Sequence, residues 1–421
     1  MQSILTFIIV FGILVIVHEF GHYIVAKKSG VLVREFSVGF GPKLFSSSGN
    51  ETTYTLRLLP LGGYVRLAGY EEESDLNPGM QVTLVLSEDN TVDVINTSSE
   101  YNANAGVAIE ITNFDLFDDM YITGRMPGYS DLQTYKVSPT AKIVEEDGTI
   151  VQVAPRDRQI QEAPIFKRML INIAGPLNNV ILAIIAFIIV AFMQGGVVVD
   201  QPVLGEIQAD SPAAAAGLQA GDRVTSIEGV QPNSWTEIQA NIQPHPGEEL
   251  EITVERGGES VTTNVTPATE TTADNQEYGL IGVMAPLDTS FWSKVAYGFS
   301  YTWQLLVALI AAIWNMISGG FSLDNLGGPV AIYAMTSQAA SGGLVTIMNW
   351  MGSLSMNLAV INMIPIPALD GGKILFNIIE AIRGKPVSEK VENIVTLVAI
   401  VFLFALVIAV TWNDIQRFII N

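Results

Sequence analysis

Four long apolar stretches constrain the fold of this 421-residue chain more than any other feature. Each reaches the roughly 20 residues that an α-helix needs to cross the hydrocarbon core of a bilayer. The hydrophobic content of 49% and the mean hydropathy of +0.37 agree with this interpretation, because soluble chains rarely carry so much apolar sequence. We therefore expect a membrane α-helical protein with four transmembrane helices. The stretches cover residues 4–26, 169–193, 344–382 and 394–412.

Basic residues mark one side of the predicted membrane. Four predicted spans place all of these residues on the same side, which the positive-inside rule makes cytoplasmic. A fifth apolar segment, residues 303–318, would break this pattern if it also crossed the membrane. We therefore expect it to lie as a helix on the outer membrane surface. The basic residues are Lys27, Lys28, Arg34, Lys43, Lys167, Arg168, Arg383, Lys385 and Lys390.

Two acidic segments lie between the apolar stretches. Residues 71–163 hold 18 acidic and 5 basic side chains, and residues 200–286 hold 14 and 2. Such acidity argues against a nucleic-acid partner, because nucleic acids bind basic patches. Cysteine is absent from the sequence, which excludes thiolate metal ligands and a cysteine nucleophile. The first apolar stretch has no basic residue before His18, so we expect a membrane helix there rather than a signal peptide.

The first apolar stretch contains the motif H-E-F-G-H. Residues four apart share one face of a helix, so His18 and His22 can bind one metal ion with Glu19 beside it. Two imidazoles suit zinc, and a carboxylate can take the proton of a zinc-activated water. Ionisable residues inside a membrane span are costly and usually functional. The alternative is a set of polar side chains that hydrogen-bond between helices. The third histidine, His245, is expected in an exposed turn without a metal role.

A zinc site of this kind needs a third protein ligand at a similar depth. Asp370, in N-M-I-P-I-P-A-L-D-G-G, is the only acid deep within another predicted span, whereas Glu380 follows close to a basic loop. Pro365 and Pro367 interrupt the helix, and irregular backbone at membrane depth must face protein or water. We therefore expect this segment to line a polar cavity, with Asp370 reaching the metal. The alternative is a kinked span with an incidental aspartate.

Two regions before the second span have β character. Residues 52–67 contain two strand-like runs around Pro60 and the pair Gly62 and Gly63, which is typical of a hairpin. On the residues alone, an ordinary surface hairpin explains this pattern equally well. Residues 71–163 contain short Val, Thr and Ile runs broken by Asn, Gly and Asp. We expect a small β-rich cytoplasmic insert there, without an assigned role.

Residues 201–286 indicate a compact module. The sequence S-P-A-A-A-A-G-L-Q-A-G-D-R-V-T-S-I-E-G at residues 211–229 predicts a short helix, a stop at Gly217 and a turn into a strand, and it resembles the PDZ domain pattern. PDZ domains bind extended peptide ends by adding a strand to a sheet edge. The alternative is a module that only excludes bulky proteins. The resemblance places the groove near residues 278–283, with the candidate contacts Tyr278, Gly279 and Gly282.

These motifs together resemble the site-2 protease family of intramembrane zinc metalloproteases. The shared sequences are V-H-E-F-G-H, L-G-G-Y-V, A-G-P-L-N-N and L-D-G-G, and one PDZ-like module between the second and third spans is typical of Gram-positive members. The resemblance implies that His18, His22 and Asp370 bind Zn²⁺ and that Glu19 is the base. The acidic insert departs from other branches of the family, which leaves its role open.

The resemblance also implies substrate contacts. Asn362 would hold the substrate backbone near the scissile bond. Asn179 in A-G-P-L-N-N would help in the same way, although helix packing explains it equally well. The 52–67 hairpin, with Gly62 and Gly63, would dip into the membrane and pair with the unwound substrate as an added strand.

The implied function is zinc-dependent intramembrane proteolysis in a bacterial cell membrane. The substrates would be single-span membrane proteins, such as anti-sigma factors and remnant signal peptides, after a first extracytoplasmic cut by a site-1-type protease. One alternative is a membrane metalloprotease with a cytoplasmic catalytic domain and a glutamate as third ligand. Another is a PDZ-bearing scaffold or chaperone with an inactive metal site. A transporter is disfavoured, because the spans show no internal repeat.

The predicted order of domains follows from these assignments. The PDZ-like module is expected outside the cell and the acidic insert in the cytoplasm. The domains are 1–27, the first transmembrane helix; 28–70, the cytoplasmic loop and membrane-associated hairpin; 71–163, the insert; 164–196, the second transmembrane helix; 200–286, the PDZ-like module; 290–340, a surface helix and linker; 342–382, the third transmembrane region; and 392–414, the fourth transmembrane helix.

Overall fold

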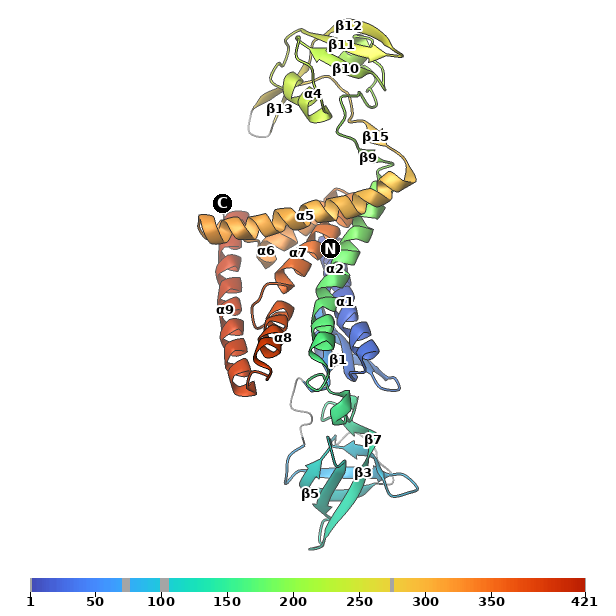
Figure 1. Ribbon diagram of the computed structural model, residues 1–421, viewed down its shortest axis with the longest axis vertical. Coiled ribbons are helices and arrows are strands. Elements are labelled where there is room, and N and C mark those ends of the chain that lie inside the picture. The colour runs from blue at the N-terminus through green and yellow to red at the C-terminus, as the bar shows by residue number, and fades with distance from the viewer. Residues whose placement is uncertain (1, 70–75, 99–105, 273–275, 421) are drawn as a thin grey trace. The chain divides into compact units, whose positions relative to one another are not determined.

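The chain forms two compact units in the computed structural model shown in Figure 1. The first unit combines Met1–Ala186 with Thr302–Asn421, and the second is Phe187–Tyr301. Parts of the predicted insert, residues 71–75 and 99–105, lie outside the described residues. The structure describes residues 2–69, 76–98, 106–272 and 276–420.

Five helices in the described part of the chain are long and apolar enough to cross a membrane. Large apolar side chains cover the outside of the last one, where Phe404 is 67% exposed, as expected of a helix that faces lipid. Inside the bundle, Val10 and Leu14 pack against Ala186 and Leu354. The five helices are α1 (Gln2–Ser29), α2 (Ile165–Met193), α5 (Phe291–Gly319), α7 (Leu344–Asn362) and α9 (Glu389–Ile415).

The apolar stretch at 344–382 forms two helices. Helix α7 ends at Asn362, and α8 begins at Asp370 and runs to Arg383, so the two prolines lie in the loop between them. The start of α8 packs tightly on that loop, because a Cβ at Gly372 would lie only 2.2 Å from the carbonyl oxygen of Ile366. Asp370 therefore occupies the first turn of a helix whose position is fixed by backbone contact.

Helix α5 covers the predicted surface segment 303–318 but is longer, at 29 residues. Figure 1 shows its later part running across the end of the bundle at which α9 finishes, not alongside α2 and α9. Trp303 and Trp314 are 65% and 67% exposed. Exposed tryptophans are typical of helices at the membrane–water interface, although α5 also meets the length and composition of a span.

The predicted hairpin has a different pairing. Residues 53–67 form one long strand, β2 (Thr53–Leu67), which pairs with β1 (Val33–Ser48). Residues 35–38 of β1 pair both with the start of β2, where Glu35 is opposite Thr53, and with its end, where Glu35 is opposite Arg66. The two runs predicted to pair with each other therefore lie on either side of β1. The prediction missed the pairing because it gave no strand to residues 33–48.

The acidic insert contains a six-stranded sheet. Its strand order is β4-β3-β5-β6-β7-β8. An additional parallel pairing of β4 with β7 joins the five strands from β4 to β7 into a closed ring. The core consists of alternate apolar residues such as Leu84, Ile109 and Ile122, which are fully buried. The strands are β3 (Gln81–Leu86), β4 (Val92–Asn96), β5 (Val107–Asp115), β6 (Tyr121–Arg125), β7 (Leu132–Val144) and β8 (Ile150–Gln152).

The insert contacts the β1–β2 sheet through the turn between β7 and β8. Lys43 of β1 donates a hydrogen bond to the carbonyl oxygen of Asp147 at 2.8 Å, and Thr53 donates to that of Ile150. Arg66 of β2 forms an ion pair with Glu145 at 2.7 Å, and both side chains are mostly buried. The insert therefore braces both strands of the sheet.

The second unit contains short strands around one apolar core. Helix α3 (Pro212–Ala215) is capped by Ser211, Gly217 has a positive φ of 77°, and a turn leads into β10 (Arg223–Ile227). The core includes Val224, Trp235 and Val254. The remaining elements are β9 (Val197–Val198), α4 (Trp235–Ile242), β11 (Leu250–Arg256), β12 (Glu259–Val265), β13 (Ala268–Thr271), β14 (Glu277–Leu280) and β15 (Leu287–Asp288).

Candidate metal centre

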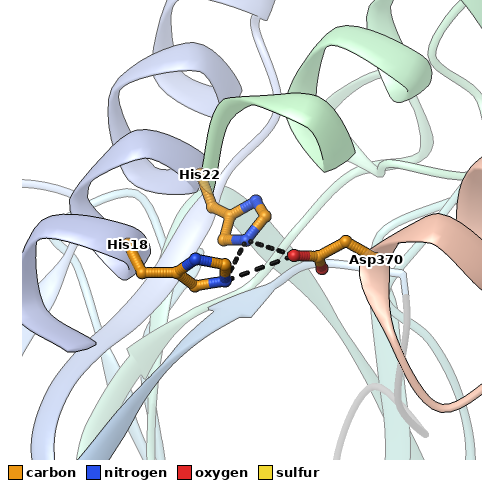
Figure 2. Close-up of side chains that lie close together, drawn as sticks. All are labelled: His18, His22 and Asp370. Atoms are coloured by element: carbon orange, nitrogen blue, oxygen red, sulfur yellow. Dashed lines mark hydrogen bonds and ion pairs between the residues drawn. The ribbon is translucent and has the colours of Figure 1, made fainter. Parts of the chain in front are cut away.

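Figure 2 shows His18 and His22 of α1 facing Asp370 of α8. The two imidazole Nε2 atoms lie 3.3 Å apart, and Oδ2 of Asp370 lies 3.2 Å from that of His18 and 3.3 Å from that of His22. Both histidines are buried. Residues far apart in the sequence thus bring two nitrogens and one oxygen to a single point.

These three side chains fit a zinc ion. One ligand atom from each residue lies within 4.8 Å of the others, and two imidazoles with one carboxylate are a common zinc set that leaves a position for water. Oδ2 of Asp370 is buried and has no partner with hydrogen-bond geometry among the described residues, although both imidazole Nε2 atoms lie 3.2 to 3.3 Å from it. A buried carboxylate is costly unless a proton donor or a cation neutralises it.

A hydrogen bond at the second ring nitrogen of His22 fixes the tautomer of this side chain. Nδ1 lies 2.7 Å from the backbone carbonyl oxygen of Ile171 on α2. Because a carbonyl oxygen only accepts, Nδ1 must carry the proton, which leaves the lone pair of Nε2 free for a metal. Sequence reasoning missed this partner, because a backbone carbonyl leaves no trace in the residue type.

Helix α2 approaches the histidines very closely. A Cβ at Gly175 would lie 2.3 Å from Nε2 of His22, and a Cβ at Gly21 would lie 2.2 Å from the carbonyl oxygen of Ala174. Only glycine at both positions lets the two helices meet here. Sequence reasoning did not single out either glycine, although Gly21 lies inside H-E-F-G-H and Gly175 inside A-G-P-L-N-N.

Glu19 and the two asparagines have different surroundings. Glu19 follows His18 on α1 and is partly buried. Asn362 is partly buried at the last turn of α7. Asn179 is fully buried, and its amide Nδ2 lies 3.2 Å from Nδ1 of His18.

The predicted hairpin glycines lie on β2, close to the histidine helix. A Cβ at Gly63 would lie 2.6 Å from the carbonyl oxygen of Ser37 and 3.5 Å from Val15, one turn before the histidines. Gly62 has a φ of 125° and packs against the ring of Phe40. This part of the sheet therefore runs beside α1 near the candidate centre.

The predicted groove residues lie in the second unit, in and after β14. Tyr278 and Gly279 pair with β13, and the amide of Gly279 also donates to the carbonyl oxygen of Gln243 at 2.8 Å. The carbonyl oxygen of Gly282 accepts from Gln208 at 2.9 Å. Several backbone groups of this segment are therefore already bonded within the module.

An apolar cavity of about 450 Å³ lies between α2, α5 and α7. Its wall includes Pro176, which directly follows the glycine packed against His22, and Ile364, which lies in the loop before Asp370. All of its lining residues belong to the first unit. The cavity therefore borders segments of α2 and of the proline loop that adjoin the centre.

Comparison with known proteins gives matches over nearly the whole chain. Residues 6–406 match the family model of peptidase family M50. The zinc metalloproteases RasP of Geobacillus kaustophilus and Bacillus licheniformis are 42% and 41% identical, over 99% of this chain and 99% of each relative. The probable protease eep of Enterococcus faecalis is 43% identical over 99% of this chain and 100% of its own length.

Comparison with solved structures gives matches to isolated PDZ domains. The PDZ domain of an SdrC-like protein from Listeria monocytogenes is 23% identical and covers 21% of this chain and 90% of that domain, with a TM-score of 0.18.

Proposed function

Since this chain belongs to peptidase family M50 and is a zinc metalloprotease of the site-2 type, we propose that it hydrolyses peptide bonds of single-span membrane proteins within or at the edge of the bilayer. One observation carries the proposal. Nε2 of His18, Nε2 of His22 and Oδ2 of Asp370 converge between helices, and α1, which carries both histidines, is apolar and long enough to cross a membrane.

We assign the zinc ligands to these three side chains and the base to Glu19. When bound, zinc would supply a Lewis acid that acidifies water and polarises the scissile carbonyl. The carboxylate of Glu19 takes the proton of the attacking water and passes it to the leaving amide nitrogen. The carbonyl of Ile171 holds the ring of His22 throughout.

Substrate binding is assigned to the β1–β2 sheet and Asn362. A helical peptide bond is already hydrogen-bonded, so the substrate must unwind before it is cut. The β2 backbone at Gly62 and Gly63 would take over its hydrogen bonds as an added strand. The amide of Asn362 would hold the substrate backbone next to Asp370. The apolar cavity beside Pro176 supports this assignment, because it offers apolar side chains a place near the centre.

The second unit is proposed to lie outside the cell and the acidic insert in the cytoplasm. This orientation follows from the basic residues of the membrane part and makes four helices spans, with α5 on the outer surface. The PDZ-like module would exclude proteins with large ectodomains, so that only proteins first shortened by an upstream protease reach the centre. Anti-sigma factors and remnant signal peptides have the required single span.

Cleavage of a tagged single-span protein with a short ectodomain, in detergent, tests this function. The wild type should release a shortened product, and Glu19→Gln should lose at least about 100-fold in rate while it keeps its zinc. A chelator should stop the wild type, and added zinc should restore it. Cutting by Glu19→Gln at the wild-type rate would refute the assigned base.

A further inference from the structure

One stripe of α2 contacts both histidines of the centre. Ile171, Gly175 and Asn179 are each four residues apart and so lie on the same face of the helix. Ile171 accepts a hydrogen bond from His22, Gly175 lets the helices approach, and Asn179 reaches His18. The residues that contact His22 and His18, Ile171 and Asn179, are eight residues apart on α2, and Gly175 lies midway between them.

The side chain of Asn179 has a vacant acceptor beside His18. It is 0% exposed, and its Oδ1 has no hydrogen-bond partner among the described residues. Its Nδ2 lies 3.2 Å from Nδ1 of His18. Its backbone carbonyl accepts a hydrogen bond from the hydroxyl of Ser355 on α7 at 2.7 Å, which holds this turn of α2 in place. A buried amide oxygen without a donor is costly.

The position of the proton on the His18 ring decides whether Nδ1 of His18 needs the donor Nδ2 or the acceptor Oδ1 of the Asn179 amide. Without a cation, a proton on Nε2 of His18 can face Oδ2 of Asp370 at 3.2 Å, and Nδ1 then accepts from the amide NH₂. When Nε2 binds a metal, the proton of the neutral ring must be on Nδ1, which then needs an acceptor. Rotating the amide by 180° exchanges Oδ1 and Nδ2 and supplies that acceptor.

We propose that Asn179 is a positioning residue for the zinc ligand His18: its Oδ1 accepts the proton of Nδ1 when zinc is bound, and its NH₂ donates to Nδ1 when zinc is absent. The amide serves both states because it carries an acceptor and a donor. This proposal rests on the assignment of His18 as a zinc ligand. It gives Asn179 a role behind the ligand instead of the substrate contact that the family resemblance implied, since a fully buried group behind His18 does not face a substrate.

Zinc release from the purified full-length protein in detergent tests this role without an activity assay. The measurement is the rate at which a chromogenic chelator takes zinc from wild type, Asn179→Leu and Asn179→Asp. Loss of an outer-shell partner typically weakens metal binding about 10- to 100-fold. Asn179→Leu, which removes the acceptor at similar volume, should release zinc faster by that factor. Asn179→Asp keeps an acceptor and should release zinc no faster than wild type.

The neighbouring Asn178 provides a matched control. Its Nδ2 donates to the backbone carbonyl oxygen of Val17 at 3.0 Å, so it also joins α2 to α1 but has no hydrogen bond to either histidine. Asn178→Leu should release zinc at the wild-type rate. Size-exclusion elution checks folding, and if Asn179→Leu fails to fold, Asn179→Asp and Asn179→Ala decide the question.

Three results would overturn the proposal: wild-type release by the folded Leu or Ala variant, fast release by Asn179→Asp, or release by Asn178→Leu as fast as that by Asn179→Leu. The last would mean that α1–α2 packing alone matters. Failure of the wild type to bind zinc would instead refute the proposed zinc site itself, so the two failures are distinguishable.

Discussion

Nη2 of Arg168 on α2 donates a hydrogen bond to Oε1 of Glu380 on α8 at 2.6 Å, with both side chains more than four-fifths buried. The pair joins the helix that contacts both histidines to the helix that begins with Asp370. Glu380 was expected near a basic loop without a role in the site. In the structure α8 is held at its start by loop packing and toward its end by this ion pair.

Removing one partner of this pair should destabilise the protein more than removing both. Arg168→Met or Glu380→Met leaves one buried charge unpaired and should cost about 3 to 5 kcal/mol, whereas the double variant leaves none. Thermal unfolding of the four proteins in detergent gives the double-mutant cycle. A double variant whose loss equals the sum of the single losses would show that the pair does not couple the helices.

Gly175→Ala should remove zinc binding and cleavage together. The added Cβ would lie 2.3 Å from Nε2 of His22, on a helix backbone that cannot move away without separating α1 from α2. Gly12→Ala is the control, because a Cβ there meets no atom within 4 Å. Zinc content and cleavage rate check both variants. Full zinc content in folded Gly175→Ala would contradict the close approach of α2.

Glu145→Lys should loosen the β1–β2 sheet from the insert. The substitution turns the mostly buried ion pair with Arg66 into a repulsion. Amide hydrogen exchange of residues 53–67 should then quicken roughly tenfold. Asp118→Lys is the matched control, because its ion pair with Arg156 lies within the insert and is about half exposed. Equal exchange in both variants would mean that the insert does not brace the sheet.

Acid should destabilise the second unit through Asp222. Hydrogen bonds from Arg256, and then from the amide of Gln219, hold the pKa of this buried carboxylate below its usual value. A lowered folded pKa contributes stability above the unfolded value of about 3.9, and this is lost as the pH falls through the folded pKa. Asp222→Asn should lower stability by about 2 kcal/mol at pH 7 and show a weaker pH dependence. The rate of proteolysis of the second unit within the full chain, measured between pH 7 and 3, reports the stability and its pH dependence for wild type and Asp222→Asn. Parallel pH profiles for the two proteins would contradict the role of Asp222.

Sequence reasoning reached the residues of the centre but not the surroundings that hold them. The four-residue spacing of His18 and His22 predicts a shared helix face. The two prolines beside Asp370 predict an irregular segment inside the membrane. The carbonyl of Ile171, the close approach at Gly175 and the hydroxyl of Ser355 depend on how α2 packs against α1 and α7. No local pattern encodes that packing.

The β regions illustrate the same limit. The runs around Pro60 indicate strands, but their partner depends on residues 33–48, whose charged and glycine-rich sequence resembles a loop. The insert was predicted to be β-rich, and its closure by β4 and β7 joins strands about fifty residues apart. Such pairings are set by tertiary contacts, so strand character could be predicted and strand order could not.

We infer that His18, His22 and Asp370 hold one zinc ion that makes this chain a protease. Zinc content and cleavage of a single-span substrate, measured together for wild type, Asp370→Ala and the control Asp324→Ala, an exposed residue of the 3-10 turn Leu323–Asn325, test it most directly. We expect about one zinc per chain and cleavage in wild type and Asp324→Ala, and loss of both in Asp370→Ala. Full zinc content with wild-type cleavage in Asp370→Ala would contradict it.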